Sequence, residues 1–371
     1  MRASGVSVFL DPITPHFGRD RLFEQHPYGD YHTPFLRVRE TFAEHGIPVH
    51  TADLLANGEA GSEVNVYFAL GTLEKYKALA GRRDVHLSAL FQFEAPIVHP
   101  SVYRGTPDAS RYFERVYSFS TPQALAPFGC GDVALEKFCI PQPFDDVFDE
   151  LWQRRDRKFL ALVSQNKLPV LDYNELYTER LRALEHFARS GDIDLYGIGW
   201  DELPFRVGER KLPPHLVRLY RFLRQRIPFG QLHPYESVIN QVYRGPVASK
   251  YETLSRYTFA LTYENMVLDG WVNEKIFDAF LAGAVPIYLG APDITDYVPK
   301  DCFVDKRDFG TYGELGEYLR SLSPDDIQTY RQNARDYLSS SMYRPFTKDA
   351  FAEIFVRALA DIGVELAAVS A

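Results

Sequence analysis

The stretch that decides the fold runs from 257 to 290 and reads YTFALTYENMVLDGWVNEKIFDAFLAGAVPIYLG. It opens with the strand-like run 257–263 and closes with the apolar run 285–289. Between them, apolar side chains recur at helical spacing from Val272 to Phe280, which predicts a helix that starts near Val272 and ends before Gly283. A strand, a helix and a strand in this order predict a parallel β-α-β unit, which binds ligands at the carboxyl ends of its strands.

The residues upstream and downstream add to the same unit. The run 159–163 (FLALV) is continuously apolar, as expected for a strand that helices cover on both faces. A helix is expected at 174–188, and further strands are expected at 193–196 and 303–304. Together these elements predict a doubly wound α/β domain.

The first third of the chain predicts another domain of the same class. Apolar runs at 6–10, 64–70 and 85–93 alternate with helical stretches at 35–45 and 73–80. This alternation is typical of β-α-β units around a parallel sheet. The fold class is therefore α/β, with two doubly wound domains that resemble the Rossmann fold and are expected to bind ligands in the cleft that they face.

The domain boundaries follow from length and composition. A chain of 371 residues exceeds the ~150 residues that are usual for one domain. The proline-containing and charged segment 139–155 is the expected linker. We place the first domain at 1–150, the second at 151–345, and a C-terminal helix at 346–371 that packs on the domains. The amphipathic part of that helix, 348–368, can cross the seam between domains or cover exposed sheet.

Charge and composition exclude several classes of protein. A net charge of -9 argues against a nucleic-acid partner, because phosphate backbones are bound through clustered Lys and Arg. The three cysteines have no paired spacing, and no signal peptide or membrane span is evident, which favours a cytoplasmic protein with at most peripheral contact at the inner membrane face. One basic region could meet a phosphate or an anionic lipid surface, although a solvated helical face is the plainer reading. It comprises Arg206, Arg210, Lys211, Arg218, Arg221, Arg224 and Arg226.

Polar residues gather where the helix of the deciding stretch begins. A helix N-terminus attracts anions such as a diphosphate, and Lys275 would add a full positive charge. Glu274 is suited to accept hydrogen bonds from a ribose diol. The structural alternative is that Asn273 caps the helix while Glu274 and Lys275 are solvated charges of its first turn.

This segment resembles the donor-binding motif of glycosyltransferase family 10, the α-1,3-fucosyltransferases. The matching residues are Glu264, Asn265, Trp271, Val272, Asn273, Glu274, Lys275, Gly283, Val285, Pro286 and Gly290. The resemblance implies a GT-B fold, an acceptor domain followed by a donor domain, and inverting transfer of L-fucose from GDP-fucose to a glycan hydroxyl (α-1,3/4 type). It also implies that Glu264, Asn265 and the residues from Trp271 to Lys275 bind the donor.

The resemblance continues upstream through Ser164-Gln-Asn166 to Arg180, and it implies that Ser164 and Asn166 also bind the donor. In the family an arginine on the first helix of the donor domain reaches the diphosphate, and this role carries over to Arg180. Arg180 lies in an otherwise apolar helical row, so its charge needs a partner. A structural salt bridge is the alternative to a phosphate. Asp172 and Glu175 have capping-box spacing just before this helix.

Two positions depart from the family pattern. Trp271 stands where a tyrosine is usual, and Asn273 stands where a threonine is usual. A tryptophan beside the transferred sugar could change donor preference, so transfer from another GDP-hexose or GDP-deoxyhexose is an alternative. A further alternative is a protein that binds sugar nucleotides or glycans without catalysis.

Glu94 is the candidate catalytic base. It follows the strand-like run 85–93 and precedes Ala95-Pro96, so it lies at a carboxyl strand end. The resemblance implies that this carboxylate removes the proton of the acceptor hydroxyl. The structural alternative is that Glu94 caps a loop or pairs with His99 or Arg104.

No metal site is expected. Asp192-Ile-Asp194 leads directly into the strand at 193–196, so we interpret it as a strand boundary and not as a metal-binding motif. The ten histidines show no metal-ligand spacing. The reaction is therefore expected to need no cofactor besides the GDP-sugar.

Overall fold

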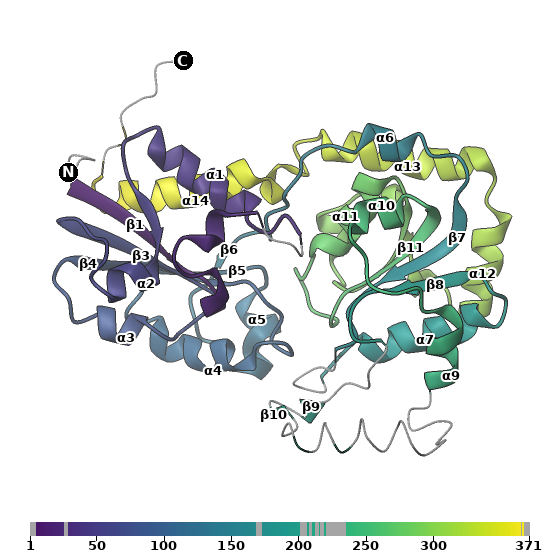
Figure 1. Cartoon of the computed structure of the whole chain (residues 1–371), viewed down its shortest axis with the longest axis horizontal. Coiled ribbons are helices and arrows are strands. Elements are labelled where there is room, and N and C mark those ends of the chain that lie inside the picture. The colour runs from purple at the N-terminus through teal and green to yellow at the C-terminus, as the bar shows by residue number, and fades with distance from the viewer. Residues whose placement is uncertain are drawn as a thin grey trace. The chain divides into compact units, whose positions relative to one another are not determined.

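The alternation of apolar runs and helices produces two parallel sheets, each in a unit of its own (Figure 1). The structure is a computed structural model that describes residues 5–25, 29–167, 173–200 and 235–364, together with 206, 207, 210, 211, 215, 219 and 366. The first unit comprises Met1–Asp145 and Ser341–Ala371, and the second comprises Asp146–Ser340. The sequence predicted these divisions at 150/151 and 345/346.

The first unit contains a six-stranded parallel sheet in the order β2-β1-β3-β4-β5-β6. Its strands are β1 Val6–Asp11, β2 Val49–Thr51, β3 Val64–Leu70, β4 Val85–Gln92, β5 Arg115–Ser118 and β6 Glu136–Lys137. Its helices are α1 Thr33–Ala43, α2 Ala52–Ala56, α3 Tyr76–Leu79, α4 Pro100–Ala109, α5 Pro122–Leu125 and α14 Lys348–Asp361, with short 3₁₀ turns at Pro15–Phe17, Arg21–Phe23, Ala126–Phe128 and Arg344–Phe346.

The two faces of this sheet bury different side chains, because successive residues of a strand point to opposite faces. Phe68 and Phe91 face α1 and α14, and Phe355 of α14 stacks on Phe91 with ring centroids 5.3 Å apart. On the other face, Tyr67 stacks on Phe113, which follows α4. The C-terminal helix thus belongs to the first unit, where it covers the sheet (Figure 1).

The second unit contains a five-stranded parallel sheet in the order β13-β12-β11-β7-β8. Its strands are β7 Lys158–Val163, β8 Ile193–Tyr196, β11 Tyr257–Tyr263, β12 Val285–Leu289 and β13 Val304–Asp305, and a separate antiparallel pair joins β9 Arg206–Val207 to β10 Arg210–Lys211. Its helices are α6 Asp149–Trp152, α7 Tyr177–Ala188, α9 Glu236–Val242, α10 Lys250–Leu254, α11 Glu274–Ala282, α12 Tyr312–Ser321 and α13 Pro324–Leu338, with 3₁₀ turns at Ile294–Asp296, Lys300–Cys302 and Lys306–Asp308.

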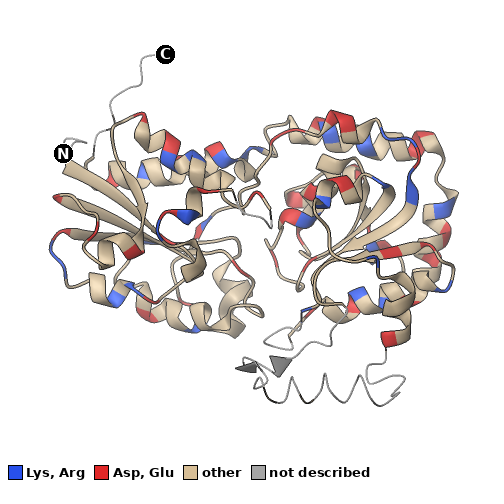
Figure 2. Cartoon of the chain, in the orientation of Figure 1, with Lys and Arg blue, Asp and Glu red and all other residues tan. Residues whose placement is uncertain are grey.

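Helices cover both faces of this second sheet. Phe259 and Leu261 of β11 pack into the cluster formed with α7, α9 and α12. Ala260, between them, packs with Ala279 and Ala282 of α11 on the opposite face. The strands are mostly tan in Figure 2, and most charged residues lie on helices and loops. The prediction of an α/β fold with doubly wound domains is confirmed.

Several expected boundaries were wrong, and each error has a local cause. The helix expected from 174 starts at Tyr177, because Asn174 has a left-handed φ of 48° and Glu175 forms a bridge with Met266. The helix expected near Val272 starts at Glu274, because Asn273 is extended and forms the N-cap. The helix expected at 73–80 is only Tyr76–Leu79.

Further expected ends also differ, among them those of the helix expected at 35–45, which is Thr33–Ala43. The strand expected at 85–93 ends at Gln92, and the strand expected at 303–304 is Val304–Asp305. The terminal helix ends at Asp361 instead of 368, and Gly363 after it has a positive φ of 77°. Asp172 lies outside the described residues. All the side chains of the basic region, from Arg206 to Arg226, also lie outside them. Among the described helices, none has the length and apolar character required to cross a membrane.

Candidate functional site

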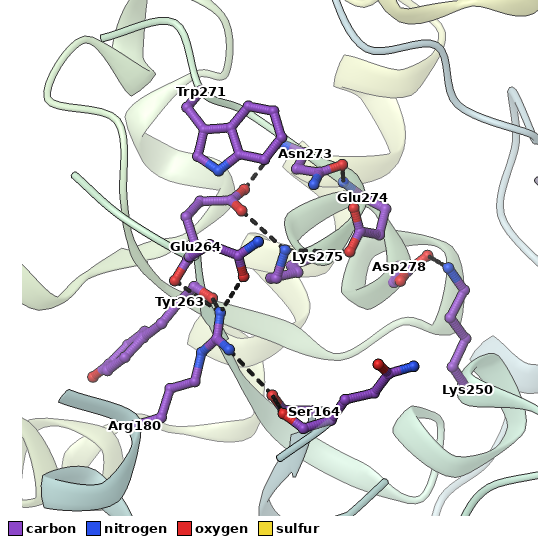
Figure 3. A network of polar contacts seen from close by, with 12 residues as sticks. Ser164, Arg180, Lys250, Tyr263, Glu264, Trp271, Asn273, Glu274, Lys275 and Asp278 are labelled. Atoms are coloured by element: carbon purple, nitrogen blue, oxygen red, sulfur yellow. Dashed lines mark hydrogen bonds and ion pairs between the residues drawn. The ribbon is translucent and has the colours of Figure 1, made fainter. Parts of the chain in front are cut away.

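Glu264 is the centre of a polar network at the carboxyl end of β11 (Figure 3). Its side chain is fully buried, and both carboxylate oxygens accept hydrogen bonds. Oε1 accepts from the Asn273 amide at 2.9 Å, and Oε2 accepts from Nζ of Lys275 at 3.0 Å. Gly290 makes room for this side chain, because a Cβ at position 290 would lie 2.5 Å from Cγ of Glu264. One carboxylate therefore connects the end of β11 to the start of α11.

The start of α11 is fixed by its own cap. Oδ1 of Asn273 accepts a hydrogen bond from the amide of Glu274 at 2.8 Å, and Gly283 ends the helix with a φ of 70°. The helix packs on the sheet through Ala279 and Ala282, and Val272 before the helix and Ile276 within it are buried. The capping alternative is thus correct for Asn273. Lys275 and Glu274, by contrast, are not solvated charges of a first turn, because both take part in the network.

Lys275 lies between two carboxylates. Its Nζ contacts Oε2 of Glu264 at 3.0 Å and Oε1 of Glu274 at 3.2 Å, and its side chain is 21% exposed. Burial alone lowers the pKa of this ammonium, but the two carboxylates outweigh it and raise the pKa above its ordinary value. Burial raises the pKa of Glu264. Burial acts in the same direction on Glu274, but Lys275 and Lys250 outweigh it and lower the pKa of Glu274. Lys275 is therefore a fixed positive charge at the N-terminus of a helix.

A second ion pair lies on the same side of α11, and sequence reasoning missed it. Nζ of Lys250, in the first turn of α10, lies 2.7 Å from Oδ1 of Asp278. Burial raises the pKa of Asp278 to about 6, although Lys250 works against this shift. Asp278 follows Glu274 by four residues, so the two carboxylates share one helix face. This i, i+4 spacing was the available signal, but no sequence pattern indicated the lysine partner.

Arg180, on α7, is buried at 4% exposure and reaches the end of β11. Its Nη2 donates to the main-chain oxygens of Tyr263 and Glu264 at 2.7 and 2.8 Å. Burial lowers the pKa of this guanidinium, but an arginine starts from a value high enough to stay charged. Among the described residues no carboxylate oxygen lies within 4.0 Å of it, and its Nε has no hydrogen-bond partner. The structural salt bridge considered above is therefore not formed there.

The smaller polar residues divide into two groups. Oγ of Ser164 accepts a hydrogen bond from Nη1 of Arg180 at 3.2 Å, and Oδ1 of Asn265 accepts one from Nη2 at 3.1 Å. Asn166 instead donates from Nδ2 to the main-chain oxygen of Gly199 at 2.9 Å. The structure thus brings Ser164 and Asn265 into the network, while Asn166 ties together the loops that follow β7 and β8.

Trp271 has no exposed surface in this structure. Its main-chain oxygen accepts a hydrogen bond from the hydroxyl of Tyr288 at 3.4 Å, and the preceding Gly270 donates to Oδ1 of Asp293 at 2.8 Å. The loop before α11 is therefore anchored at two points. Contact between the indole and a transferred sugar stays a prediction, and it requires this loop to move.

Glu94 lies in the first unit, two residues beyond the end of β4, and is half-buried. Its main-chain oxygen accepts a hydrogen bond from the hydroxyl of Tyr103 at 2.6 Å. His99 is the N-cap residue of α4, and Arg104 lies within that helix. The expected position at a carboxyl strand end is therefore observed, while its role as a base stays a prediction.

The aspartates of the Asp-x-Asp segment face ion-pair partners of their own. Asp192 contacts Nη2 of Arg320 at 2.5 Å, whereas Asp194 contacts Lys158 at 2.8 Å and Arg244 at 2.7 Å. Asp194 lies within β8, as expected for a strand boundary. In the part of the chain that the structure describes, no group of three His, Cys, Asp or Glu residues could hold a metal ion.

Comparisons with known proteins find a family match for part of the chain. Residues 213–343 match the family model "Glycosyltransferase family 10 (fucosyltransferase) C-term". An α-(1,4)-fucosyltransferase of Arabidopsis thaliana is 39% identical over 74 residues, which are 20% of this chain and 18% of the relative. A 4-galactosyl-N-acetylglucosaminide 3-α-L-fucosyltransferase of Mus musculus is 38% identical over 72 residues, which are 19% of this chain and 20% of the relative. The match thus spans about a fifth of the length of these curated relatives.

A wider likeness concerns the fold alone. The solved structure of an α-glucosyltransferase in complex with UDP and a DNA 13-mer aligns over 96% of this chain and 99% of that one, with 13% identity and a TM-score of 0.51. The two parallel sheets therefore form a GT-B fold. Residues 213–343, which include Glu264, Lys275 and Asp278, are similar to the C-terminal domain of glycosyltransferase family 10.

Proposed function

We propose that this protein is a glycosyltransferase that moves L-fucose from GDP-fucose to a hydroxyl of an oligosaccharide or glycoconjugate acceptor, with inversion at the anomeric carbon. The match of residues 213–343 to the family model supports the reaction class, and the two curated relatives are fucosyltransferases by name. The α-1,3/4 linkage and the GDP carrier come from the family resemblance. The second unit would hold the donor and the first unit would bind the acceptor.

The observation that carries the proposal is the buried cation of Arg180. This guanidinium is 4% exposed, and its hydrogen bonds in the described chain go to neutral acceptors, so it forms no direct ion pair there. Such a charge is costly to bury unless an anion joins it. Lys275 and the N-terminus of α11 belong to the same network and also favour an anion. A diphosphate supplies that negative charge.

The proposed reaction has one transfer step. Glu94 takes the proton of the acceptor hydroxyl while that oxygen attacks the anomeric carbon from the face opposite the diphosphate. The bond between the anomeric carbon and the β-phosphate oxygen breaks, and GDP leaves with that electron pair. Lys275 and Arg180 stabilise the charge that grows on the diphosphate. Glu274 accepts hydrogen bonds from the ribose, as the family resemblance implies.

Two departures from the family motif make a different donor sugar the second candidate. Trp271 and Asn273 replace the usual tyrosine and threonine, and Trp271 belongs to the anchored loop before α11. A different side chain at this point could admit another GDP-hexose or GDP-deoxyhexose.

A donor panel with a mixed glycan acceptor array, analysed by mass spectrometry, tests the proposal. We expect transfer from GDP-fucose above all other GDP-sugars, and we expect GDP to raise the melting temperature far more than UDP does, because a ligand of the folded state stabilises it. Transfer from another GDP-sugar would replace fucose as the donor. Equal protection by UDP would contradict the guanine assignment, and tight GDP binding without turnover on any acceptor would indicate a binding protein.

A further inference from the structure

The turn that carries Glu94 is held tightly by the first unit. β4 ends at Gln92, and the turn that follows buries Ala95 and Ile97 completely. The amides of Val98 and His99 both donate to the main-chain oxygen of Ala95, at 2.9 and 3.1 Å. The residues just after Glu94 therefore have little freedom to move.

Tyr103 adds a bond to Glu94 itself. Tyr103 lies on α4 with 1% of its surface exposed, and its hydroxyl donates to the main-chain oxygen of Glu94 at 2.6 Å. Rotation of that peptide group would break the bond and turn the Cα–Cβ direction of residue 94. Burial raises the pKa of the Tyr103 phenol far above neutrality, so the hydroxyl keeps the proton that it donates.

A second layer of buried, uncharged groups supports Tyr103. The thiol of Cys130 donates to the main-chain oxygen of Tyr103 at 3.4 Å, and burial raises the pKa of that thiol. Nε2 of Gln92 donates to Oγ1 of Thr106 at 3.2 Å and lies 3.7 Å from Sγ of Cys130. Gln92, Thr106 and Cys130 have no exposed surface. The end of β4, the turn and α4 are thus tied together on the side where Glu94 emerges.

We propose that Tyr103 is a positioning residue for the catalytic base, which it aims through the main chain of Glu94. The inference rests on the proposed function, in which Glu94 takes the proton of the acceptor hydroxyl. A base acts only within hydrogen-bond reach of that proton, and a small misplacement of a reacting group lowers the rate strongly. Tyr103 is expected to touch neither substrate.

The test is a double-mutant cycle between Tyr103→Phe and Glu94→Gln, measured as kcat and KM for fucosyl transfer. We expect Tyr103→Phe to lower kcat by roughly 10- to 100-fold with KM for GDP-fucose unchanged. In the Glu94→Gln background the same change should alter kcat by less than about twofold, because there is no base left to misplace.

Tyr76→Phe is the matched control. Tyr76 is also buried, and its hydroxyl donates to Oδ2 of Asp108, on the same helix α4, at 3.1 Å. Its loss should destabilise the unit in a similar way and leave kcat near the wild-type value. If Tyr103→Phe does not fold, Cys130→Ala replaces it, because that variant removes the bond behind Tyr103 and keeps the phenol. Its effect should also vanish in the Glu94→Gln background.

The outcomes separate the two ideas. An equal loss of kcat in both backgrounds, or no loss in the wild-type background, overturns the role of Tyr103 and leaves the proposed function intact. Wild-type turnover by Glu94→Gln overturns the base and the positioning role together, although transfer itself persists. No transfer by the wild-type protein on any acceptor overturns the proposed function, and the inference falls with it.

Discussion

The carboxyl ends of β11 and β4 each present a glutamate, but the surroundings of the two differ in kind. Glu264 is fully buried and both its oxygens are bonded, one to an amide and one to the ammonium of Lys275. Glu94 is half-buried, and the hydroxyl of Tyr103 bonds its main chain. The bonds to Glu264 hold its charged carboxylate in place. The bond from Tyr103 instead holds the main chain of Glu94 and so sets the direction in which its side chain leaves the backbone. The first arrangement suits the binding of an anion, and the second suits the aiming of a base.

The largest effect should come from Glu94→Gln, which tests whether the two ends have separate roles. The amide keeps the shape of the side chain but cannot take a proton, so kcat should fall by roughly 10²- to 10⁴-fold, the usual contribution of a general base. GDP affinity should stay unchanged, because the residues proposed to bind the donor all lie in the second unit. Steady-state kinetics with isothermal titration measures both.

Near wild-type turnover in this variant would remove Glu94 from the mechanism. Glu264 is a poor replacement, because it is buried and both its oxygens are already bonded. A collapse of GDP affinity together with turnover would instead mean that Glu94 acts on the fold.

Lys275→Ala should give the next largest effect, because it removes one of the cations proposed for the diphosphate. We expect GDP binding to weaken by about 2 kcal/mol, the usual worth of a hydrogen bond to a charged group. The variant should also lose about 3–5 kcal/mol of unfolding free energy, since Glu264 is left buried without its partner. Isothermal titration and urea unfolding measure the two quantities separately.

Lys158→Ala is the matched control for that loss. Lys158 pairs with Asp194 at 2.8 Å but is an exposed residue at the amino end of β7, away from the carboxyl strand ends. This variant should bind GDP like the wild type. If Lys275→Ala also keeps wild-type GDP affinity while it loses stability, the network at the end of β11 is structural and the contrast with Glu94 disappears.

Asp278→Asn should have a smaller effect that depends on pH. Burial raises the pKa of Asp278 from 3.8 to about 6. The proton that the folded state retains therefore contributes stability that is fully present below pH 3.8 and is lost as the pH rises through about 6. The unfolding free energy of the wild type minus that of the variant should fall by roughly 1–3 kcal/mol between pH 4 and pH 7. Urea unfolding at both values measures it, and a difference that does not change with pH would contradict the shift.

The sequence predicted most of the second unit because its signals are long and agree with one another. The strands 257–263 and 285–289 were placed at their observed bounds, and Glu264 and Lys275 lie together as expected for the end of a strand and the start of a helix. Helix starts were less predictable, because an N-cap such as Asn273 and a left-handed residue such as Asn174 act locally against the apolar repeat.

The remaining parts of the site depend on contacts between distant segments. Lys250 meets Asp278 only because α10 packs beside α11, and Tyr103 meets Glu94 only because α4 packs on the end of β4. Neither residue belongs to a sequence motif. Hydrogen bonds to main-chain oxygens, which Arg180 and Tyr103 both make, leave no pattern of paired side chains in the sequence.

The smallest effect is expected from removal of divalent metal ions. This removal tests whether the network at the end of β11 can bind the diphosphate without a metal ion. A bound metal ion can stabilise the negative charge on phosphoryl oxygens. Here Asp192 and Asp194 are bonded to arginine and lysine side chains, while Lys275 and Arg180 supply two positive charges beside a helix N-terminus. We therefore expect activity in EDTA to stay within about twofold of the untreated protein, since fixed cations can stabilise the leaving diphosphate.

The measurement is the initial rate of transfer after dialysis against EDTA, with Lys275→Ala run in parallel. Complete loss in EDTA that Mn²⁺ or Mg²⁺ restores would place a metal ion in the reaction, and Lys275 would then be one part of a site that also needs carboxylate ligands.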